Sequence, residues 1–174
     1  MPQTVPDFDE LLRSARHSAV HLEMRDAYGV SGEAAAFEAW KAGGPRDLDP
    51  DSPYWSSWTS LIREITGRGV AVRRARIVSE PVTDYIRFEH SGTPVIIAVG
   101  EAVRWLPRRH ASDIALPGND FWLIDDKLVR FNHFTGDGAA ADPEMSDDPA
   151  VAELCRTAFE TVWERGTPHD RYRV

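Results

Sequence analysis

The chain has 174 residues, the length of one ordinary domain, and its 42% hydrophobic and 28% charged residues are typical of a folded globular protein. Its net charge of -8 argues against independent binding of nucleic acid, because neutralised phosphates supply most of that binding energy. The lone Cys155 excludes an intrachain disulfide, and with no apolar run of about 20 residues and an acidic start we expect a cytoplasmic protein without membrane contact.

The first part of the chain is expected to be mainly helical. Asp7 and the glutamate three residues later form a capping box, and the apolar spacing after them predicts a helix over residues 7–19. A second helix is predicted over 33–41, where it stops at a Gly-Gly pair. The loop that follows is the best internal boundary, between a helical part of about residues 1–52 and a sheet-containing part of about 53–174.

The central part predicts a helix, a tight turn and a strand. The helix covers residues 57–67 and is closed by glycine, and the β-branched segment 70–78 after it predicts a strand. Side chains alternate along a strand, so Arg74 and Arg76 share one face and Arg73 lies on the other.

The rest of the chain adds three strands and a long helix. Residues 82–90 suit either a helix or an alternating strand, and we favour the helix. Strands are predicted at 102–106, 121–124 and 128–131, the last two joined as a hairpin at an Asp-Asp turn. Apolar residues at i, i+3 and i+4 predict a helix over 149–165 that docks on the sheet. Its docking residues are expected to be Leu154, Ala158, Phe159, Val162 and Trp163. The fold class is therefore α+β: a single domain with a small mixed sheet packed by N-terminal, central and C-terminal helices.

Arginine and glutamate alternate through the predicted sheet region. A guanidinium pairs bidentately with a carboxylate or a phosphate, so we expect these side chains to gather near the carboxyl ends of strands 70–78 and 102–106. Two interpretations are open: a partly buried ion network that fixes the sheet, or a pocket for an anionic ligand or an acidic peptide. We favour the network, because interleaved acids repel an anion. The candidate residues are Arg74, Arg76, Glu80, Arg87, Glu89, Glu101, Arg104 and Trp105.

Charge is also uneven along the chain. Residues 60–110 hold nine arginines and five acids, whereas residues 137–170 hold nine acids and two arginines. The simpler interpretation is that both are solvated faces with weak ion pairs. The alternative is a basic groove guarded by an acidic segment.

Signals for metal or nucleophilic chemistry are weak. His17 and His21 are four residues apart on or just beyond the predicted first helix, with Glu23 close by, but no second pair completes a metal site. We expect no metal and no cofactor. Cys155 lies on the apolar face of the last predicted helix, which indicates a buried and unreactive thiol.

Five segments carry a resemblance to a known family. The chain resembles a family of small actinobacterial proteins of uncharacterised function, whose genes commonly lie beside helix-turn-helix regulators of the Cro/repressor type. The resemblance implies a regulatory role with such a regulator as protein partner. The segments are HLEMRDAY (21–28), GVAVRRARIVSEPVTDYIRFEH (69–90), GEAVRWLPR (100–108), LPGNDFWLID (116–125) and FETVWERGTPHDRY (159–172).

The order of elements is also similar to one half of a phospholipase D-like domain, in which a strand like GVAVRRARIV and a hairpin like FWLIDDKLVRF recur. Enzymes of that class need a histidine, a lysine two residues later and a more distant aspartate, with the histidine as nucleophile on phosphorus. Here the two lysines, Lys41 and Lys127, follow Ala39 and Asp125 at that spacing. The resemblance therefore implies a degenerate, non-catalytic domain.

We predict a non-enzymatic regulatory or interaction protein that contacts a helix-turn-helix regulator, does not bind nucleic acid directly and has a small ligand as a further option. The alternative is an enzyme that acts on an anionic, phosphate- or carboxylate-bearing substrate through its arginines.

Overall fold

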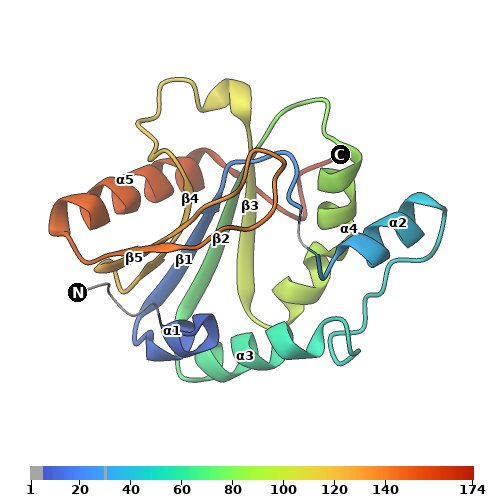
Figure 1. The fold of residues 1–174 in the computed structure, drawn as a ribbon, viewed down its shortest axis with the longest axis horizontal. Coiled ribbons are helices and arrows are strands. Elements are labelled where there is room, and N and C mark those ends of the chain that lie inside the picture. The colour runs from blue at the N-terminus through green and yellow to red at the C-terminus, as the bar shows by residue number, and fades with distance from the viewer. Residues whose placement is uncertain (1–5, 30) are drawn as a thin grey trace.

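A mixed sheet of seven strands organises the described residues, 6–29 and 31–174, of this computed structural model (Figure 1). The strands are β1 (Ser18–Glu23), β2 (Ala71–Val78), β3 (Glu101–Pro107), β4 (Asp120–Ile124), β5 (Leu128–Asn132), β6 (Glu144–Ser146) and β7 (Thr167–Pro168). Their order is β6-β5-β4-β1-β2-β3-β7. The three strands β1, β2 and β3 run parallel, and every other neighbouring pair is antiparallel. The acidic start of the chain, residues 1–5, lies outside the described residues.

Five α-helices accompany the sheet in this part of the chain. They are α1 (Phe8–Ser14), α2 (Ala34–Lys41), α3 (Ser56–Gly67), α4 (Asp84–Ala98) and α5 (Pro149–Arg165), with a short 3-10 turn at Arg108–His110. Helix α5 packs across one face of the sheet, while α1, α3 and α4 pack on the other. Helix α2 packs on α4, and Figure 1 shows this pair at the end of the molecule away from α1. The predicted single α+β domain is confirmed. None of the described helices is long and apolar enough to cross a membrane.

The prediction of one helix over residues 7–19 was wrong, because α1 ends at Ser14 and the chain then enters the central strand β1. The carboxylate of Asp125 accepts the backbone N–H groups of Arg16, His17 and Ser18 at 2.7 to 3.2 Å, which holds the chain extended at this point. Four successive residues of β1 are buried, since both faces of the sheet are covered. A strand buried on both sides lacks the alternation that would distinguish it from a helix. The part expected to be helical, 1–52, thus supplies the middle strand of the sheet.

Most other predicted elements are confirmed. The two helical predictions at 57–67 and 149–165 correspond to α3 and α5, and the helix favoured for residues 82–90 corresponds to α4, which begins at Asp84 and continues to Ala98. The hairpin of β4 and β5 turns at Asp125 and Asp126, which both have positive φ (50° and 57°), as a two-residue turn of this kind requires. Strands β6 and β7, which are three and two residues long, were not predicted.

The docking residues predicted for α5 are right except for one. Ala158, Phe159 and Val162 are buried against the sheet and Trp163 is half-buried, but Leu154 is 42% exposed. The buried face instead includes Cys155, one residue further along. A helix turns 100° per residue, so this one-residue difference moves the apolar stripe off Leu154.

The final segment closes the β3 edge of the sheet. Strand β7 pairs with β3 through Thr167 and Pro168, and the ring of Tyr172 stacks on Trp105 with centroids 5.5 Å apart. The Nε2 of His90 lies 3.1 Å from the backbone oxygen of Tyr172.

The two faces of the sheet differ in polarity. The α5 face is a continuous apolar core around Leu22, Ile77 and Phe121. The opposite face carries two separate apolar clusters, one under α1 and α3 and one under α4. The strand residues between these clusters are charged, and they form the floor of the site described next.

Candidate functional site

An ion network crosses the three parallel strands on the face under α3 and α4. The strand register places His21 beside Arg74 and Glu23 beside Arg76. Side chains two residues apart in a strand share a face, so β1 and β2 each present two polar residues to the same side. Glu101, at the start of β3, completes the row and is 2% exposed.

Glu23 joins the two arginines of the network. Its Oε1 lies 2.9 Å from Arg74 Nη1 and its Oε2 lies 2.9 Å from Arg76 Nε. Arg74 Nε is 2.5 Å from Glu101 Oε1, and Arg76 Nη1 is 2.9 Å from Glu89 Oε2 on α4. Burial alone would disfavour the charge on Arg76, but Glu23 and Glu89 outweigh burial and raise its pKa. Burial opposes the charge of Glu23 in the same way, yet the two arginines lower its pKa to about 2. Both guanidinium groups are therefore already neutralised by carboxylates of the chain.

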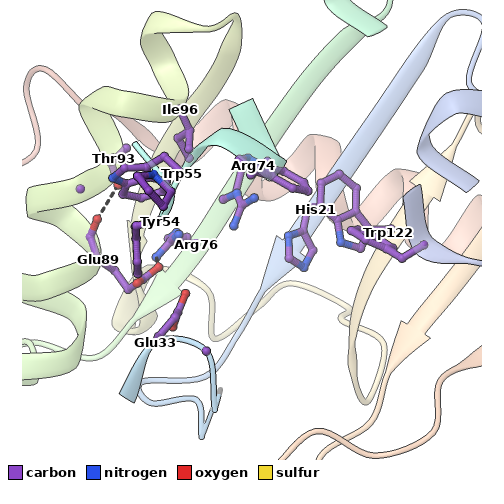
Figure 2. Close-up of a pocket in the computed structure, with 15 residues that line it drawn as sticks. His21, Glu33, Tyr54, Trp55, Arg74, Arg76, Glu89, Thr93, Ile96 and Trp122 are labelled. Atoms are coloured by element: carbon purple, nitrogen blue, oxygen red, sulfur yellow. Dashed lines mark hydrogen bonds and ion pairs between the residues drawn. The ribbon is translucent and has the colours of Figure 1, made fainter. Parts of the chain in front are cut away.

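A cavity of about 620 Å³ lies over this network, between the sheet, α4 and the segment that leads into α3 (Figure 2). Its walls are largely aromatic and its floor holds the arginines. The aromatic lining residues are Phe8, Tyr54, Trp55, Trp58 and Trp122. In Figure 2 Glu33, Tyr54, Arg76 and Glu89 lie toward one end, His21 and Trp122 lie toward the other, and Arg74 lies between them. This size and lining are those of a small-molecule site.

The aromatic walls are tied to the network. Trp58 Nε1 donates a hydrogen bond to Glu101 Oε2 over 3.2 Å, and Trp122 stacks on His21 with ring centroids 4.3 Å apart. The guanidinium of Arg74 lies over both indoles, 5.6 Å and 5.8 Å from the ring centroids. These contacts fix the rings around the cavity before any ligand enters.

Glu33 is the acidic group of the cavity that has no ion pair with a described residue. It directly precedes α2, and its Oε2 accepts a hydrogen bond from the Tyr85 hydroxyl over 2.8 Å. Burial and the nearby carboxylate of Glu89 raise the pKa of Glu33 to about 7. Its charge therefore changes near neutral pH.

His21 is buried and neutral. Burial lowers its pKa to about 3, even though Glu23 Oε1 is only 3.5 Å from its Nδ1. That nitrogen makes no hydrogen bond to any described residue. Of the two placements open to His17 and His21, on the first helix or just beyond it, the structure shows the second: His17 directly precedes β1 and is exposed, and His21 lies within β1. Within 6–29 and 31–174 no group of three His, Cys, Asp or Glu residues is arranged to hold a metal ion.

Half of the predicted arginine and glutamate cluster is assembled at this site. Arg74, Arg76, Glu89 and Glu101 form the network described above. Trp105 lies beneath it, fully buried, with its ring 5.1 Å from the guanidinium carbon of Arg76. The network spans the sheet from the start of β3 to the far part of β2, so it is not confined to the carboxyl ends of the strands.

The other predicted members lie elsewhere. Arg104 points to the α5 face, where its Nη1 donates to the backbone oxygen of Trp163 over 2.8 Å. Arg87 is half-exposed and lies 4.0 Å from Asp84 on its own helix. Glu80 accepts a hydrogen bond from Tyr172 near the end of the sequence. The prediction grouped residues that alternate in the sequence, but the sheet and α4 place Arg104, Arg87 and Glu80 away from the network.

Sequence reasoning predicted the carboxylates Glu89 and Glu101 but missed Glu23, Glu33 and the aromatic walls of the cavity. Glu23 and His21 were assigned to the region of a helix, and recognition of HLE as a strand would have placed both on the face of Arg74. The aromatic cluster PYWSSW at 53–58 was a usable signal, since three of its rings line the cavity. Glu33 carried no signal beyond its place at a helix start.

Cys155 is buried in the α5 core, as predicted. Burial raises the pKa of its thiol to about 11, so the protonated form prevails at neutral pH.

The family described as Domain of unknown function (DUF6879) matches residues 6–174. Among curated protein sequences, none matches this chain. A phospholipase D family member, Nuc from Salmonella typhimurium, is structurally similar, with a TM-score of 0.54 and 14% identity over 95% of this chain and 88% of that one. This likeness shows a shared fold, as the order of elements had indicated. Two further structures match with lower scores. TrmBL2, an archaeal chromatin protein, has a TM-score of 0.48 at 13% identity and covers 91% of this chain and 47% of its own. NucT from Helicobacter pylori has a TM-score of 0.47 at 12% identity, over 92% of this chain and 87% of its own.

Proposed function

The chain belongs to the family described as Domain of unknown function (DUF6879), and from this premise we propose that the protein is a non-enzymatic regulatory protein. It binds a small ligand in the aromatic cavity and acts through contact with a helix-turn-helix regulator. The observation that carries the proposal is a preformed cavity whose arginines are already paired with the chain's own carboxylates. A cavity of this size and lining is suited to binding a small molecule.

The chemistry of the cavity argues for binding over turnover. The fold resembles that of a phospholipase D family member, but the histidine and lysine pair on which that chemistry depends is absent from the sequence. The one histidine of the lining, His21, is neutral and has a strongly lowered pKa, which makes it a poor base.

An enzyme that clamps an anionic substrate through arginines is less well supported. Arg74 and Arg76 contact three carboxylates between them, and an incoming phosphate would have to displace those carboxylates or approach them. Breaking buried ion pairs of this kind costs several kcal/mol, about 3–5 per pair. The geometry therefore favours a ligand that binds without displacing the carboxylates from Arg74 and Arg76.

The regulator as partner is supported by charge and by the resemblance of the sequence. The outer face of α5 exposes Glu153 and, about three turns further along, Glu164; Leu154 is exposed beside Glu153, whose carboxylate pairs with Arg156. A helix-turn-helix protein carries basic surface for DNA, which this acidic face complements. We propose that the face of α5 is the contact.

Two measurements test the proposal. The purified protein is assayed with a generic phosphodiester, and no turnover is expected. Turnover that is lost on substitution of any one histidine would contradict the non-enzymatic assignment. The protein is also co-expressed with the neighbouring regulator, with and without Glu153→Lys and Glu164→Lys. Copurification that the two substitutions weaken supports the partner, and the absence of copurification contradicts it.

A further inference from the structure

We propose that the end of the cavity between Glu33 and Glu89 binds the positively charged group of an organic ammonium cation whose apolar, planar body lies against the aromatic walls. This inference rests on the proposed ligand-binding function and names the chemical class of the ligand. It follows from charge balance and from the aromatic lining.

The network under the cavity is short of positive charge. The network and the neighbouring Glu33 together hold four carboxylates, Glu23, Glu33, Glu89 and Glu101, against the two guanidinium groups of Arg74 and Arg76. Each arginine already contacts two carboxylates, and Glu33 is left without a cation among the described residues. A ligand cation placed beside Glu33 and Glu89 would relieve the repulsion between these two side chains.

Other arginines near the cavity do not fill this position. The charge of Arg130 lowers the pKa of His21, which lies at the opposite end of the cavity. Arg46, in the loop after α2, lies over the rings of Tyr54 and Phe88 and makes no ion pair with a described carboxylate. Counting Arg46 still leaves four carboxylates against three guanidinium groups in the network and around it.

The aromatic wall is suited to a cation, and the chain itself demonstrates this. The guanidinium carbon of Arg46 lies 5.1 Å from the ring centroid of Tyr54 and 5.0 Å from that of Trp55, and both rings also line the cavity. A cation over an aromatic face gains about 0.5–2 kcal/mol, more when water is excluded. An ammonium group would meet aromatic faces and carboxylates together.

His21 and Trp122 form the other end of the cavity. The His21 ring is 7% exposed and stacks on Trp122, while its Nδ1 is enclosed and lies 3.5 Å from Glu23 Oε1 without a hydrogen bond. These two stacked rings offer a surface for the planar body of the ligand at the end of the cavity away from Glu33.

Binding of a cation should depend on pH, because only ionised Glu33 attracts it. The groups that act on Glu33 come from every element around it: Tyr85 and Glu89 of α4, Arg76 of β2, Glu23 of β1 and Tyr54 before α3. With burial and Glu89 holding the pKa of Glu33 at about 7, the carboxyl is mostly protonated at pH 6 and mostly ionised at pH 8. The affinity for an amine that stays protonated at both pH values should therefore rise by about tenfold between them.

The test compares three probes that share an indole ring and differ in charge: tryptamine, tryptophol and indole-3-propionate. Binding is measured by titration calorimetry at pH 6 and pH 8. We expect tryptamine to bind best, about tenfold more tightly at pH 8, and to release protons on binding near pH 7. Glu33→Gln should weaken tryptamine binding by about tenfold at pH 8 and flatten its pH profile, while Glu38→Gln, which removes an exposed carboxylate from the same helix, should change neither.

Each outcome bears on the inference. Equal or tighter binding of tryptophol or indole-3-propionate overturns the cation assignment and leaves a ligand-binding cavity in place. Absence of binding by all three probes also overturns it, while the copurification experiment decides the regulatory proposal separately. Should Glu33→Gln fail to fold, the pH profile and the proton release of the unmodified protein decide the question alone.

Discussion

Arg76 shows how a single residue maintains a polar site within a core. It is 4% exposed and lies between Glu23 and Glu89, which compensate its charge. Replacement by methionine keeps the bulk of the side chain and removes the cation. We expect Arg76→Met to cost about 3–5 kcal/mol of unfolding free energy at neutral pH, because Glu89 loses its guanidinium partner and Glu23 keeps only Arg74.

The loss in Arg76→Met should shrink in acid. In the native protein the pKa of Glu23 is about 2, below its unfolded value, so its ion pairs stabilise the fold above pH 4.5 and are lost as the pH falls toward 2. Without Arg76, Glu23 and Glu89 take up protons at a higher pH, so acid removes less stability from the variant than from the unmodified protein. Urea denaturation at pH 7 and pH 4 measures both values, and a cost below about 1 kcal/mol at pH 7 would show that the network is not needed for stability.

Glu33 should behave in the opposite sense. Its folded pKa of about 7 lies above the unfolded value of 4.5, so the folded state loses stability as the pH rises between these values. Glu33→Gln removes this penalty and should stabilise the protein by about 2 kcal/mol at pH 8, with little effect at pH 4. Thermal melting across this range checks the prediction, with Glu38→Gln as the unchanged control. Destabilisation at pH 8 would contradict the raised pKa.

At the residue scale, the sequence predicted the two arginines of the site and two of their carboxylate partners, Glu89 and Glu101, and missed Glu23 and the aromatic walls. Arg74 and Arg76 could be placed on one face because strand β2 has a strong β-branched pattern. Their partners come from β1, α4 and β3, and a single sequence does not show which strands are neighbours. Four of the eight proposed side chains are in the ion network for this reason.

At the scale of elements, α5 offers a clear pair of substitutions. Phe159 is fully buried in the core, whereas Leu154 on the same helix is 42% exposed. Phe159→Ala should therefore cost about 3–5 kcal/mol and Leu154→Ala less than about 0.5 kcal/mol. Denaturation of both variants measures the difference. Equal costs would contradict the orientation of the helix on the sheet.

The elements that were predicted share a strong local pattern. Helix α5 is capped by Asp148, whose side chain accepts the backbone N–H of Ala150, and its apolar period is unbroken. Strand β1 had no such pattern, because it is buried on both faces and follows a genuine helix cap at Asp7. Strands β6 and β7 are too short to show a period at all. Such segments become strands because they pair with neighbouring strands, and the local sequence does not show that pairing.

At the scale of the whole molecule, charge governs which partners are accessible. The basic and acidic segments of the sequence meet in the structure through the pair of Arg73 and Glu160, with nitrogen and oxygen atoms 2.6 and 3.0 Å apart. This pair is partly exposed and does not close a groove.

We expect the protein alone to have no tight affinity for duplex DNA, because each phosphate contact requires a cation. Labelled operator DNA is titrated with the regulator, with this protein and with both, at two salt concentrations. The protein should alter binding by the regulator in a salt-sensitive manner. Tight binding by the protein alone would contradict the charge argument, and no effect on the regulator would remove the partner from the proposal.

The short pairing of β7 with β3 has a consequence for self-association. Strand β3 would otherwise be an edge with unpaired backbone donors and acceptors, the surface through which sheets of separate molecules join. Two residues of β7 and the stacked ring of Tyr172 cover this edge. Removal of residues 167–174 should therefore shift the protein from a single species to dimers and larger assemblies in size-exclusion chromatography, whereas Tyr172→Ala, which keeps β7, should not. A truncated protein that elutes unchanged would show that the edge is protected by its twist or by its neighbours. We therefore expect residues 167–174 to prevent the sheets of separate molecules from pairing along β3.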